Sequence, residues 1–239
     1  MCQPRKRLPF KDPLELLPRG LTKLNSIWVS LVYPFASKGR NISFHFTSTV
    51  RRHRAPRISL GNSVALAKDA WLNVSNESPT GEPVIVLEDN CFIGDGSILS
   101  AKNRIHLERD VAVAQSVVIM DHNHAYEDIT TPIADQGITQ GGRIRIGRGS
   151  WIAHGACIVC PKGELTIGRN CVIAANALVT RSIPDYSVVA GNPARIIRHY
   201  DPETRAWRIG SQLRDVDSHR NGSNQALPLP LSALHEDGI

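Results

Sequence analysis

The sequence lacks the long apolar segments that mark membrane-spanning and secreted proteins. Its longest nearly apolar run, Ile27 to Ala36, is interrupted by a serine and a proline. A membrane-spanning helix needs about 20 apolar residues, so this run is too short. The charged N-terminus is not followed by an apolar stretch with a cleavage site, as a signal peptide requires. We therefore expect a cytoplasmic protein.

Aromatic residues are scarce, at 5% of 239 residues, whereas apolar residues make up 41%. The apolar content is enough for a hydrophobic core, which argues against a wholly disordered chain. The low aromatic content argues against a core of large stacked rings and favours a slim core of Ile, Val, Leu and Ala. The length alone predicts one or two domains.

The cysteines lack the pairing of a disulfide framework or a structural zinc site. There are five, at Cys2, Cys91, Cys157, Cys160 and Cys171, and an odd number without a signal peptide predicts free thiols. Cys157 and Cys160 form a CxxC, but a structural zinc needs four ligands, and neither a second CxxC nor a following HxxxH is present. We expect no metal and interpret the CxxC as inert, with half a zinc site or a redox pair as the alternative.

Acidic residues are nearly absent from the first 57 residues. The net charge is +6 overall, but residues 1–57 carry twelve Lys and Arg against Asp12 and Glu15. A basic excess can meet nucleic acid, an anionic membrane or a phosphorylated ligand. We expect no nucleic-acid partner; the N-terminal arm is either solvated or in contact with the inner face of an anionic membrane.

A six-residue repeat dominates the rest of the chain. Hexads start at Leu87 and, after two register breaks, resume at Ile146 and Ile167. Small residues recur at the fifth position, for example Cys91 and Cys171, and a weaker prelude starts at Ile58. All twelve opening residues are Leu, Ile or Val: Leu87, Ile93, Leu99, Ile105, Val111, Val117, Ile146, Ile152, Ile158, Ile167, Ile173 and Val179.

A period of six fits neither an α-helix nor a plain strand alternation. It predicts a short strand and a turn, three times per coil, with each aliphatic residue stacked on its equivalent about 18 residues later. The small fifth residue then points inward near a corner, which accounts for Cys91 and Cys171 without chemistry.

These hexads resemble those of the hexapeptide-repeat acyltransferases over about residues 84–198, and more weakly over 58–83. The resemblance implies an all-β solenoid, a left-handed parallel β-helix. The left hand comes from the resemblance alone, because parallel crossovers usually run right-handed. We expect a basic N-terminal arm or cap over 1–57 with a helix within 21–35, the β-helix over 58–198 with an extruded loop at 123–143, and over 199–239 a C-terminal helix (202–217) and flexible tail.

The repeat breaks at the histidine-rich segment Met120–Tyr126. A loop that leaves a regular solenoid is typical of a functional site, with a polar loop carrying surface histidines as the alternative. The segment resembles the galactoside and maltose O-acetyltransferases and their polysaccharide-modifying relatives. There a histidine at the loop entrance is the general base, and the resemblance assigns this role to His122, with His124 as the alternate.

A neutral imidazole suits this role because it can take the proton of an attacking alcohol near neutral pH. No Ser or Cys nucleophile is needed if the transfer is direct. The candidates to orient the imidazole are Asp121, Glu127 and Asp128, and the sequence does not choose among them.

The segment Val179–Arg198, with Gly191-Asn192-Pro193-Ala194, resembles the closing coil and GNPA-type cap of the same family. In relatives this part lines the coenzyme A groove between adjacent subunits, which implies acetyl-CoA as co-substrate and a homotrimer. An extra residue in Cys160–Glu164, where many relatives have a Pro-Gly turn, alters the groove wall locally. By position, the expected coenzyme contacts are Ala153, Ala175, Thr180, Arg181 and Arg195, the arginines facing phosphates or else being solvated charges.

The sequence therefore predicts an O-acetyltransferase that moves acetyl from acetyl-CoA to a hydroxyl of a sugar or polysaccharide precursor. One alternative is a metal-dependent carbonic anhydrase of the same fold, which needs three converging histidines. The paired spacing of that class is absent from His106, His122, His124 and His154. A non-catalytic β-helix scaffold is the other alternative.

Overall fold

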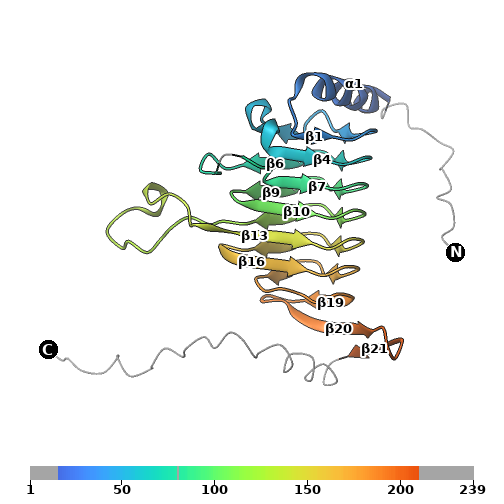
Figure 1. The fold of residues 1–239 in the computed structure, drawn as a ribbon, viewed down its shortest axis with the longest axis vertical. Coiled ribbons are helices and arrows are strands. Elements are labelled where there is room, and N and C mark those ends of the chain that lie inside the picture. Colours follow the sequence, from blue (N-terminus) through green and yellow to red (C-terminus); the bar gives the residue numbers. More distant parts are fainter. Residues whose placement is uncertain (1–15, 80, 210–239) are drawn as a thin grey trace.

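The computed structural model describes residues 16–79 and 81–209. Its main body is a tall stack of coils made of short strands, with helix α1 (Leu16–Val32) across one end (Figure 1). Successive strands pass in turn to three sheets, and from β1 to β15 each strand pairs in parallel with the strand three elements later. The predicted parallel β architecture is confirmed, while the left hand of the coil stays a prediction.

Each sheet takes one strand from every coil. The first sheet contains β1 (Ser37–Lys38), β4 (Ile58–Leu60), β7 (Ile85–Leu87), β10 (Arg104–Leu107), β13 (Gly141–Ile146) and β16 (Lys162–Ile167). The second contains β2 (Ser43–Phe44), β5 (Ala65–Leu66), β8 (Phe92–Ile93), β11 (Ala112–Val113), β14 (Trp151–Ile152), β17 (Val172–Ile173), β19 (Ser187–Ala190), β20 (Arg195–Asp201) and β21 (Ala206–Ile209). The third contains β3 (Thr49–Val50), β6 (Trp71–Val74), β9 (Ile98–Ala101), β12 (Val118–Met120), β15 (Cys157–Val159) and β18 (Leu178–Val179).

The interior of the stack is the core that the hexads predict. All twelve opening residues are buried, from Leu87 to Val179. The small fifth residues are buried as well, and the hydroxyls of Ser97 and Ser150 donate to the carbonyls of Ala114 and Gly168.

The stacking partner within the core differs from the expected one. Leu87 pairs with Leu107, and Ile85 pairs with Ile105, so this coil has 20 residues rather than 18. The additional residues lie where the chain passes from β9 to β10. Two extra residues keep the inward and outward alternation, because side chains alternate with a period of two. The hexads therefore identify the inward residues correctly but not their partners.

The three corners of the coil differ in regularity. We call the turn from the first to the second sheet the first corner, the next one the second corner, and the return to the first sheet the third corner. Every first and second corner has four residues between its strands, whereas the third corner has from two to twenty. In the regular turns, residues such as Asn90 and Gly96 adopt φ of 61° and 64°, which Asn and Gly tolerate best.

The stack begins earlier than the sequence predicts. Strands β1, β2 and β3 form a complete first coil inside the segment 1–57, and the 3-10 helix η2 (Arg52–Arg57) leads into the next coil. Helix α1 lies against β2: the amide of Asn25 donates to the carbonyl of Phe44 at 3.2 Å, and Ser26 Oγ accepts from the Phe44 N–H at 2.9 Å. Val29 is the buried residue of α1.

The other end of the stack is an antiparallel hairpin. Strand β20 folds back on β19 and pairs with β21. The helix expected over 202–217 is absent from residues 202–209, where Asp201 accepts the Glu203 N–H at 2.9 Å and the rings of Tyr200 and Trp207 pack with centroids 5.5 Å apart. Residues 210–217 lie outside the described part of the chain. In the described residues, no helix combines the length and apolar content needed to cross a membrane.

Candidate active site

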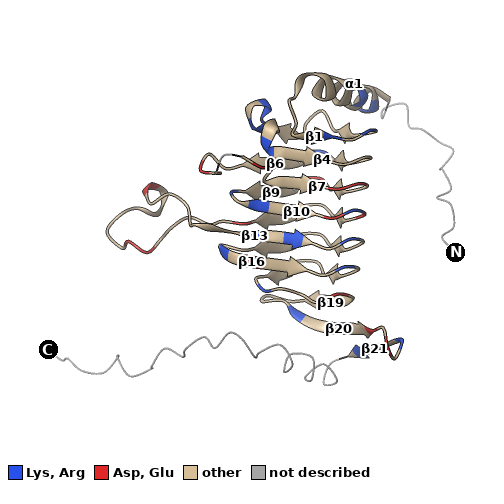
Figure 2. Ribbon diagram, viewed as in Figure 1, with Lys and Arg blue, Asp and Glu red and all other residues tan. Residues whose placement is uncertain are grey.

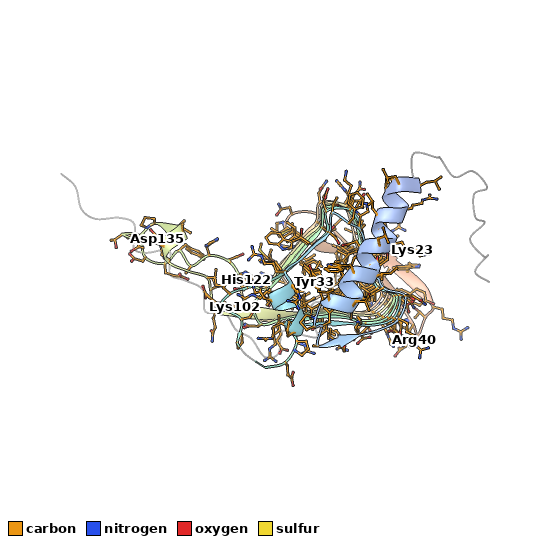
Figure 3. All side chains as sticks on the ribbon, turned by 90° about the horizontal axis from the view of Figure 1, so that it is seen from above. Lys23, Tyr33, Arg40, Lys102, His122 and Asp135 are labelled. Atoms are coloured by element: carbon orange, nitrogen blue, oxygen red, sulfur yellow. The ribbon has the colours of Figure 1, made fainter. Side chains whose placement is uncertain are left out.

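The third corner between β12 and β13, residues 121–140, is the longest. It forms a loop, here called the arm, that projects from the stack (Figures 1 and 3). Its neck is a short antiparallel ribbon. The Thr139 N–H donates to the Asn123 carbonyl at 2.8 Å, the Asn123 N–H donates to Thr139 Oγ1 at 3.0 Å, and the Ala125 N–H donates to the Gly137 carbonyl at 3.2 Å. The arm is therefore fixed at its base, while Asp135 in the 3-10 helix η3 (Ile133–Asp135) lies far from the stack.

Two glycines return the arm to the stack. At Gly141, with φ of 81°, an added Cβ would lie 2.8 Å from Asn103 Nδ2. At Gly142 it would lie 2.5 Å from Cys160 Sγ. Both distances are too short for a side chain, so the residue pair allows β13 to start tight against its neighbours.

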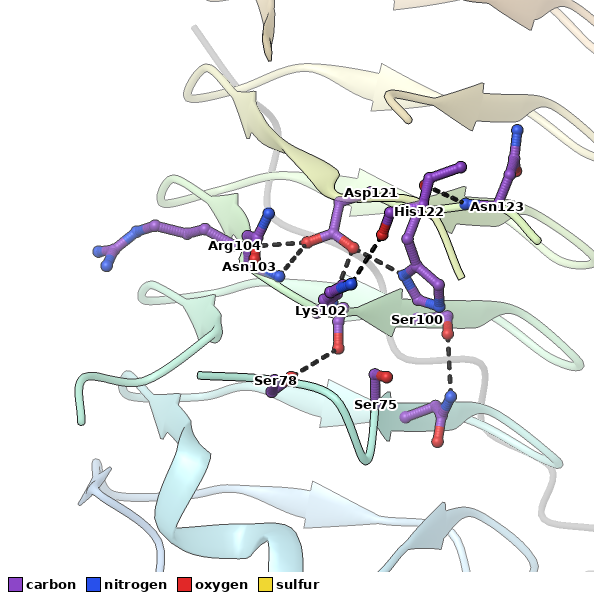
Figure 4. Close-up of polar contacts among 12 residues, drawn as sticks. Ser75, Ser78, Ser100, Lys102, Asn103, Arg104, Asp121, His122 and Asn123 are labelled. Atoms are coloured by element: carbon purple, nitrogen blue, oxygen red, sulfur yellow. Dashed lines mark hydrogen bonds and ion pairs between the residues drawn. The ribbon is translucent and has the colours of Figure 1, made fainter. Parts of the chain in front are cut away.

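A buried carboxylate ties the entrance of the arm to the preceding coil. Asp121 has no exposed surface and accepts three backbone N–H groups, from Lys102 at 2.7 Å and from Asn103 and Arg104 at 2.8 Å each (Figure 4). Lys102 and Asn103 form the two-residue corner between β9 and β10, and Arg104 is the first residue of β10. A buried carboxylate needs such donors, because desolvation without them is costly.

His122 lies directly on this carboxylate. Its Nδ1 is 2.8 Å from Asp121 Oδ1, and the residue is only 8% exposed. Since an ionised carboxylate only accepts, Nδ1 is the protonated nitrogen of the neutral ring. Nε2 then carries the lone pair, and the imidazole is oriented to accept a proton there.

Of the three acids that could orient the imidazole, only Asp121 contacts it. Asp128 instead accepts hydrogen bonds from Thr130 and Thr131 inside the arm, and these lower its pKa to about 2. The carboxylate of Glu127 accepts the Tyr126 N–H. The sequence could not separate these candidates, because the donors that hold Asp121 come from another coil.

His122 lines a pocket of about 320 Å³ on the third-sheet side of the stack. That volume lies at the lower end of the range for small-molecule sites. Trp71 and Asn73 of β6 form part of its wall, and the Asn73 amide donates to Ser100 Oγ at 2.9 Å. The indole Nε1 of Trp71 is buried and has no hydrogen-bond partner among the described residues.

The pocket also contains polar and charged side chains from other third corners, including Arg51 and Glu77. Glu77 is 3.2 Å from Lys102 Nζ, and the same ammonium donates to the Thr139 carbonyl at 2.7 Å, which connects the pocket wall to the neck of the arm. Sequence reasoning missed Arg51, Trp71 and Glu77, because outward positions of the early coils show no recognisable pattern.

The residues predicted to contact coenzyme A lie at two different corners and at the start of β20. Thr180 and Arg181 follow β18, which lies two strands from β12 in the third sheet, so they share the third corner with His122. Ala153 and Ala175 follow β14 and β17 at the second corner. Arg195 opens β20 opposite Ala190. Ala153 is buried, and the other four are exposed.

Three other histidines named in the sequence analysis, His106, His124 and His154, do not line this pocket. His124 is exposed and bridges Ile138 in the neck of the arm. His106 is on the first sheet, with Nε2 2.8 Å from Glu88 Oε1, and His154 is exposed at a second corner. In the described part of the chain, no three His, Cys, Asp or Glu side chains come together as a metal site would require.

The cysteines in the described part of the chain are buried or half-buried thiols, which accounts for them without a chemical role. Cys91, Cys157, Cys160 and Cys171 are free thiols, and Cys2 lies outside the described residues. Burial raises the pKa of Cys91 to about 12 and that of Cys171 to about 11, and it also raises the pKa of Cys157 and of Cys160. Such thiols stay protonated and unreactive at neutral pH.

No family model matches the chain. A provisionally named acetyltransferase of Mycobacterium tuberculosis is 37% identical over 135 residues, covering 54% of this chain and 42% of that protein. A provisionally named lipopolysaccharide biosynthesis O-acetyl transferase of Escherichia coli, WbbJ, is 31% identical over 133 residues, covering 53% of this chain and 66% of that protein. Both relatives are named acetyltransferases, which agrees with the resemblance of the hexads to the hexapeptide-repeat acyltransferases. The match spans less than half of the first relative and less than two thirds of the second.

Solved structures of low sequence identity share the fold. A mutant of the N-acyltransferase AntD from Bacillus cereus, in complex with dTDP and coenzyme A, matches with a TM-score of 0.60 at 16% identity, covering 75% of this chain and 90% of that chain. Another AntD mutant, in complex with dTDP-4-amino-4,6-dideoxyglucose and coenzyme A, matches with a TM-score of 0.58 at 15% identity over the same shares.

Proposed function

We propose that this protein is an O-acetyltransferase that transfers acetyl from acetyl-CoA to a hydroxyl of a sugar or polysaccharide precursor. The observation that carries the proposal is the Asp121–His122 pair at the rim of a pocket, with a 2.8 Å contact that leaves Nε2 free to accept a proton. The named activities of the relatives support an acetyl group as the cargo. The nucleotide sugar and coenzyme A bound to AntD support a carbohydrate acceptor and a coenzyme A thioester donor.

In the proposed reaction, the acceptor hydroxyl donates its proton to His122 Nε2 while its oxygen attacks the thioester carbonyl carbon. The resulting oxyanion is held by a backbone N–H or similar donor. It collapses with cleavage of the C–S bond, and the departing thiolate takes the proton from the imidazolium. Asp121 keeps the ring in the required tautomer and stabilises its transient positive charge, while the three backbone donors keep Asp121 in place.

The acceptor is proposed to lie in the pocket against Trp71. A ring edge or face of a sugar can pack on the indole of Trp71, which is half-buried in the pocket wall. The flanking Arg51 and Glu77 would select among acceptors by charge.

Acetyl-CoA is proposed to approach from the C-terminal side of His122. Thr180 and Arg181 follow β18 at the same third corner as His122, two strands further along the sheet. The exposed guanidiniums of Arg181 and Arg195 suit phosphate groups. Since the predicted contacts are divided between two corners of one chain, a neighbouring subunit would complete the groove. We therefore propose a homotrimer with a site at each interface.

The test is an acceptor screen with acetyl-CoA, followed through release of the free thiol and mass spectrometry of the product. We expect acceptor-dependent thiol release and an acetyl ester on a sugar, both lost in His122→Gln. Release with amino sugars alone, yielding an amide, would replace O-acetyl with N-acetyl transfer. No release with any acceptor, together with no binding of acetyl-CoA, would leave the scaffold alternative.

A further inference from the structure

Helix α1 turns its polar side toward the protein and its apolar side outward. Asn25 and Ser26 form hydrogen bonds with the backbone of β2, and Val29 is buried in the core. The end of the helix is held in addition by Lys38 and Arg52, which donate to the carbonyls of Ser30 and Val32. The helix is therefore fixed on the stack by one face.

The opposite face is a continuous apolar surface. At 100° per residue, its members fall within an arc of about 140°. Their exposed fractions range from 39% for Leu21 to 80% for Leu31. We call this surface the outer face of α1, and its members are Leu16, Leu17, Leu21, Leu24, Ile27, Trp28 and Leu31. Single exposed apolar residues are ordinary, but a contiguous patch of large ones marks a binding surface.

The positive charge around the outer face of α1 indicates what kind of partner binds there. From residue 16 to residue 57 the chain carries eight Lys and Arg and no Asp or Glu, and Figure 2 shows basic and no acidic positions on α1. Arg19 and Lys23 border the outer face, and with His45 they line a groove of about 590 Å³ between α1 and β2. An apolar helix face with a tryptophan and a basic border is the pattern of helices that lie in the surface of an anionic bilayer.

We propose that the outer face of α1 binds an anionic lipid bilayer and lies in the plane of its surface. The Leu, Ile and Trp side chains enter the boundary between headgroups and acyl chains, and the basic border meets the anionic headgroups. Because α1 lies across one end of the stack (Figures 1 and 3), the coils would extend away from the bilayer in this arrangement. The proposal does not depend on acetyl transfer.

The test is sedimentation of the full chain with phosphatidylcholine vesicles that contain or lack phosphatidylglycerol. We expect binding to the anionic vesicles that weakens with salt. The variant Leu24→Gln/Leu31→Gln removes two outer-face residues that are 66% and 80% exposed. Its partition coefficient is expected to fall at least about tenfold, because binding scales with the buried apolar area. Lys23→Gln should lower it about fivefold.

The matched control is Ile129→Gln/Ile133→Gln, which removes two apolar side chains of the arm that are 96% and 56% exposed. It should bind vesicles like the unmodified protein. As a second readout, lipids brominated on their acyl chains should quench tryptophan fluorescence, and this quenching should largely disappear in Trp28→Phe.

Three results would overturn the proposal. The unmodified protein stays in the supernatant with anionic vesicles; the control loses as much binding as the outer-face variant; or Trp28 is not quenched by the brominated lipids. If light scattering then shows that Leu24→Gln/Leu31→Gln separates an oligomer, the outer face contacts a second copy of the chain instead.

Discussion

The first and second corners of the coil never change length, whereas the third corner changes in almost every turn. The regular corners have four residues each, and the third corner ranges from two to twenty. His122, the arm and most of the pocket wall belong to the third corner. The third corners are therefore the variable part of a regular scaffold, and the candidate active site lies at them.

The difference has a physical cause. A changed length at a regular corner would shift a strand against its parallel neighbours, and a shift of one residue would reverse its inward and outward side chains. Residues inserted at a surface corner cost little, since loop-closure entropy grows slowly with length. The third corner can therefore acquire residues such as His122 without loss of the core.

The largest expected effect concerns close backbone contact at a regular corner. A Cβ at Gly94 would lie 2.5 Å from the Ala114 backbone of the next coil, whereas at Gly96, with φ of 64°, nothing lies within 4 Å. Gly94→Ala should lower the free energy of unfolding by about 3 kcal/mol or more, and Gly96→Ala by about 1–2 kcal/mol. Urea unfolding of both variants measures the difference, and equal losses would refute close contact as the reason for the regularity.

The sequence predicted the buried core of the coils more completely than the residues of the third corner. The hexads predicted the buried residues because inward positions repeat, and the break in the repeat predicted the arm and His122. The 20-residue coil step was missed because two added residues preserve the alternation of side chains. The choice of Asp121 over Glu127 and Asp128, and the pocket wall of Trp71 and Glu77, could not be predicted, because they depend on which residues of separate coils meet at one corner.

The next largest effect is expected at the two arginines that are proposed to bind coenzyme A. Arg181→Ala and Arg195→Ala should each raise the KM for acetyl-CoA roughly tenfold and leave kcat nearly unchanged, because a charged contact made equally in ground and transition states is lost. The control is Arg40→Ala, which changes an exposed arginine between β1 and β2 in the first coil, at the opposite end of the stack. An unchanged KM in both variants would remove these arginines from the proposed groove.

The buried thiols predict a pH dependence of the core. Burial raises the pKa of the Cys91 thiol to about 12, whereas the ordinary pKa of a cysteine thiol, which applies in the unfolded chain, is 9.0. Above that value the unfolded chain binds fewer protons than the native one, so stability falls as pH rises. The fall in the free energy of unfolding between neutral and alkaline pH should be smaller in Cys91→Ala/Cys171→Ala. An identical fall would show that the thiols are not buried as described.

The smallest effect is expected from the arm. Replacing residues 126–136 by Asn-Gly closes the ribbon beyond Ala125 and Gly137, whose hydrogen bond is kept. The free energy of unfolding should change by less than about 1 kcal/mol, because this segment packs no core residue. A loss as large as that of Gly94→Ala would make the arm part of the scaffold and remove the contrast between the corners.

The most direct test of the account is kcat for His122→Ala beside His124→Ala, each with its KM for acetyl-CoA. The buried His122 is held by Asp121, whereas the exposed His124 is in the neck of the arm. We predict that His122→Ala lowers kcat by roughly 10²–10⁴-fold without loss of coenzyme affinity, as expected for a general base, and that His124→Ala has a much smaller effect. If His124→Ala is the inactive variant, the base is His124; if both variants keep full kcat, the third corner is not the catalytic site and the mechanism is wrong.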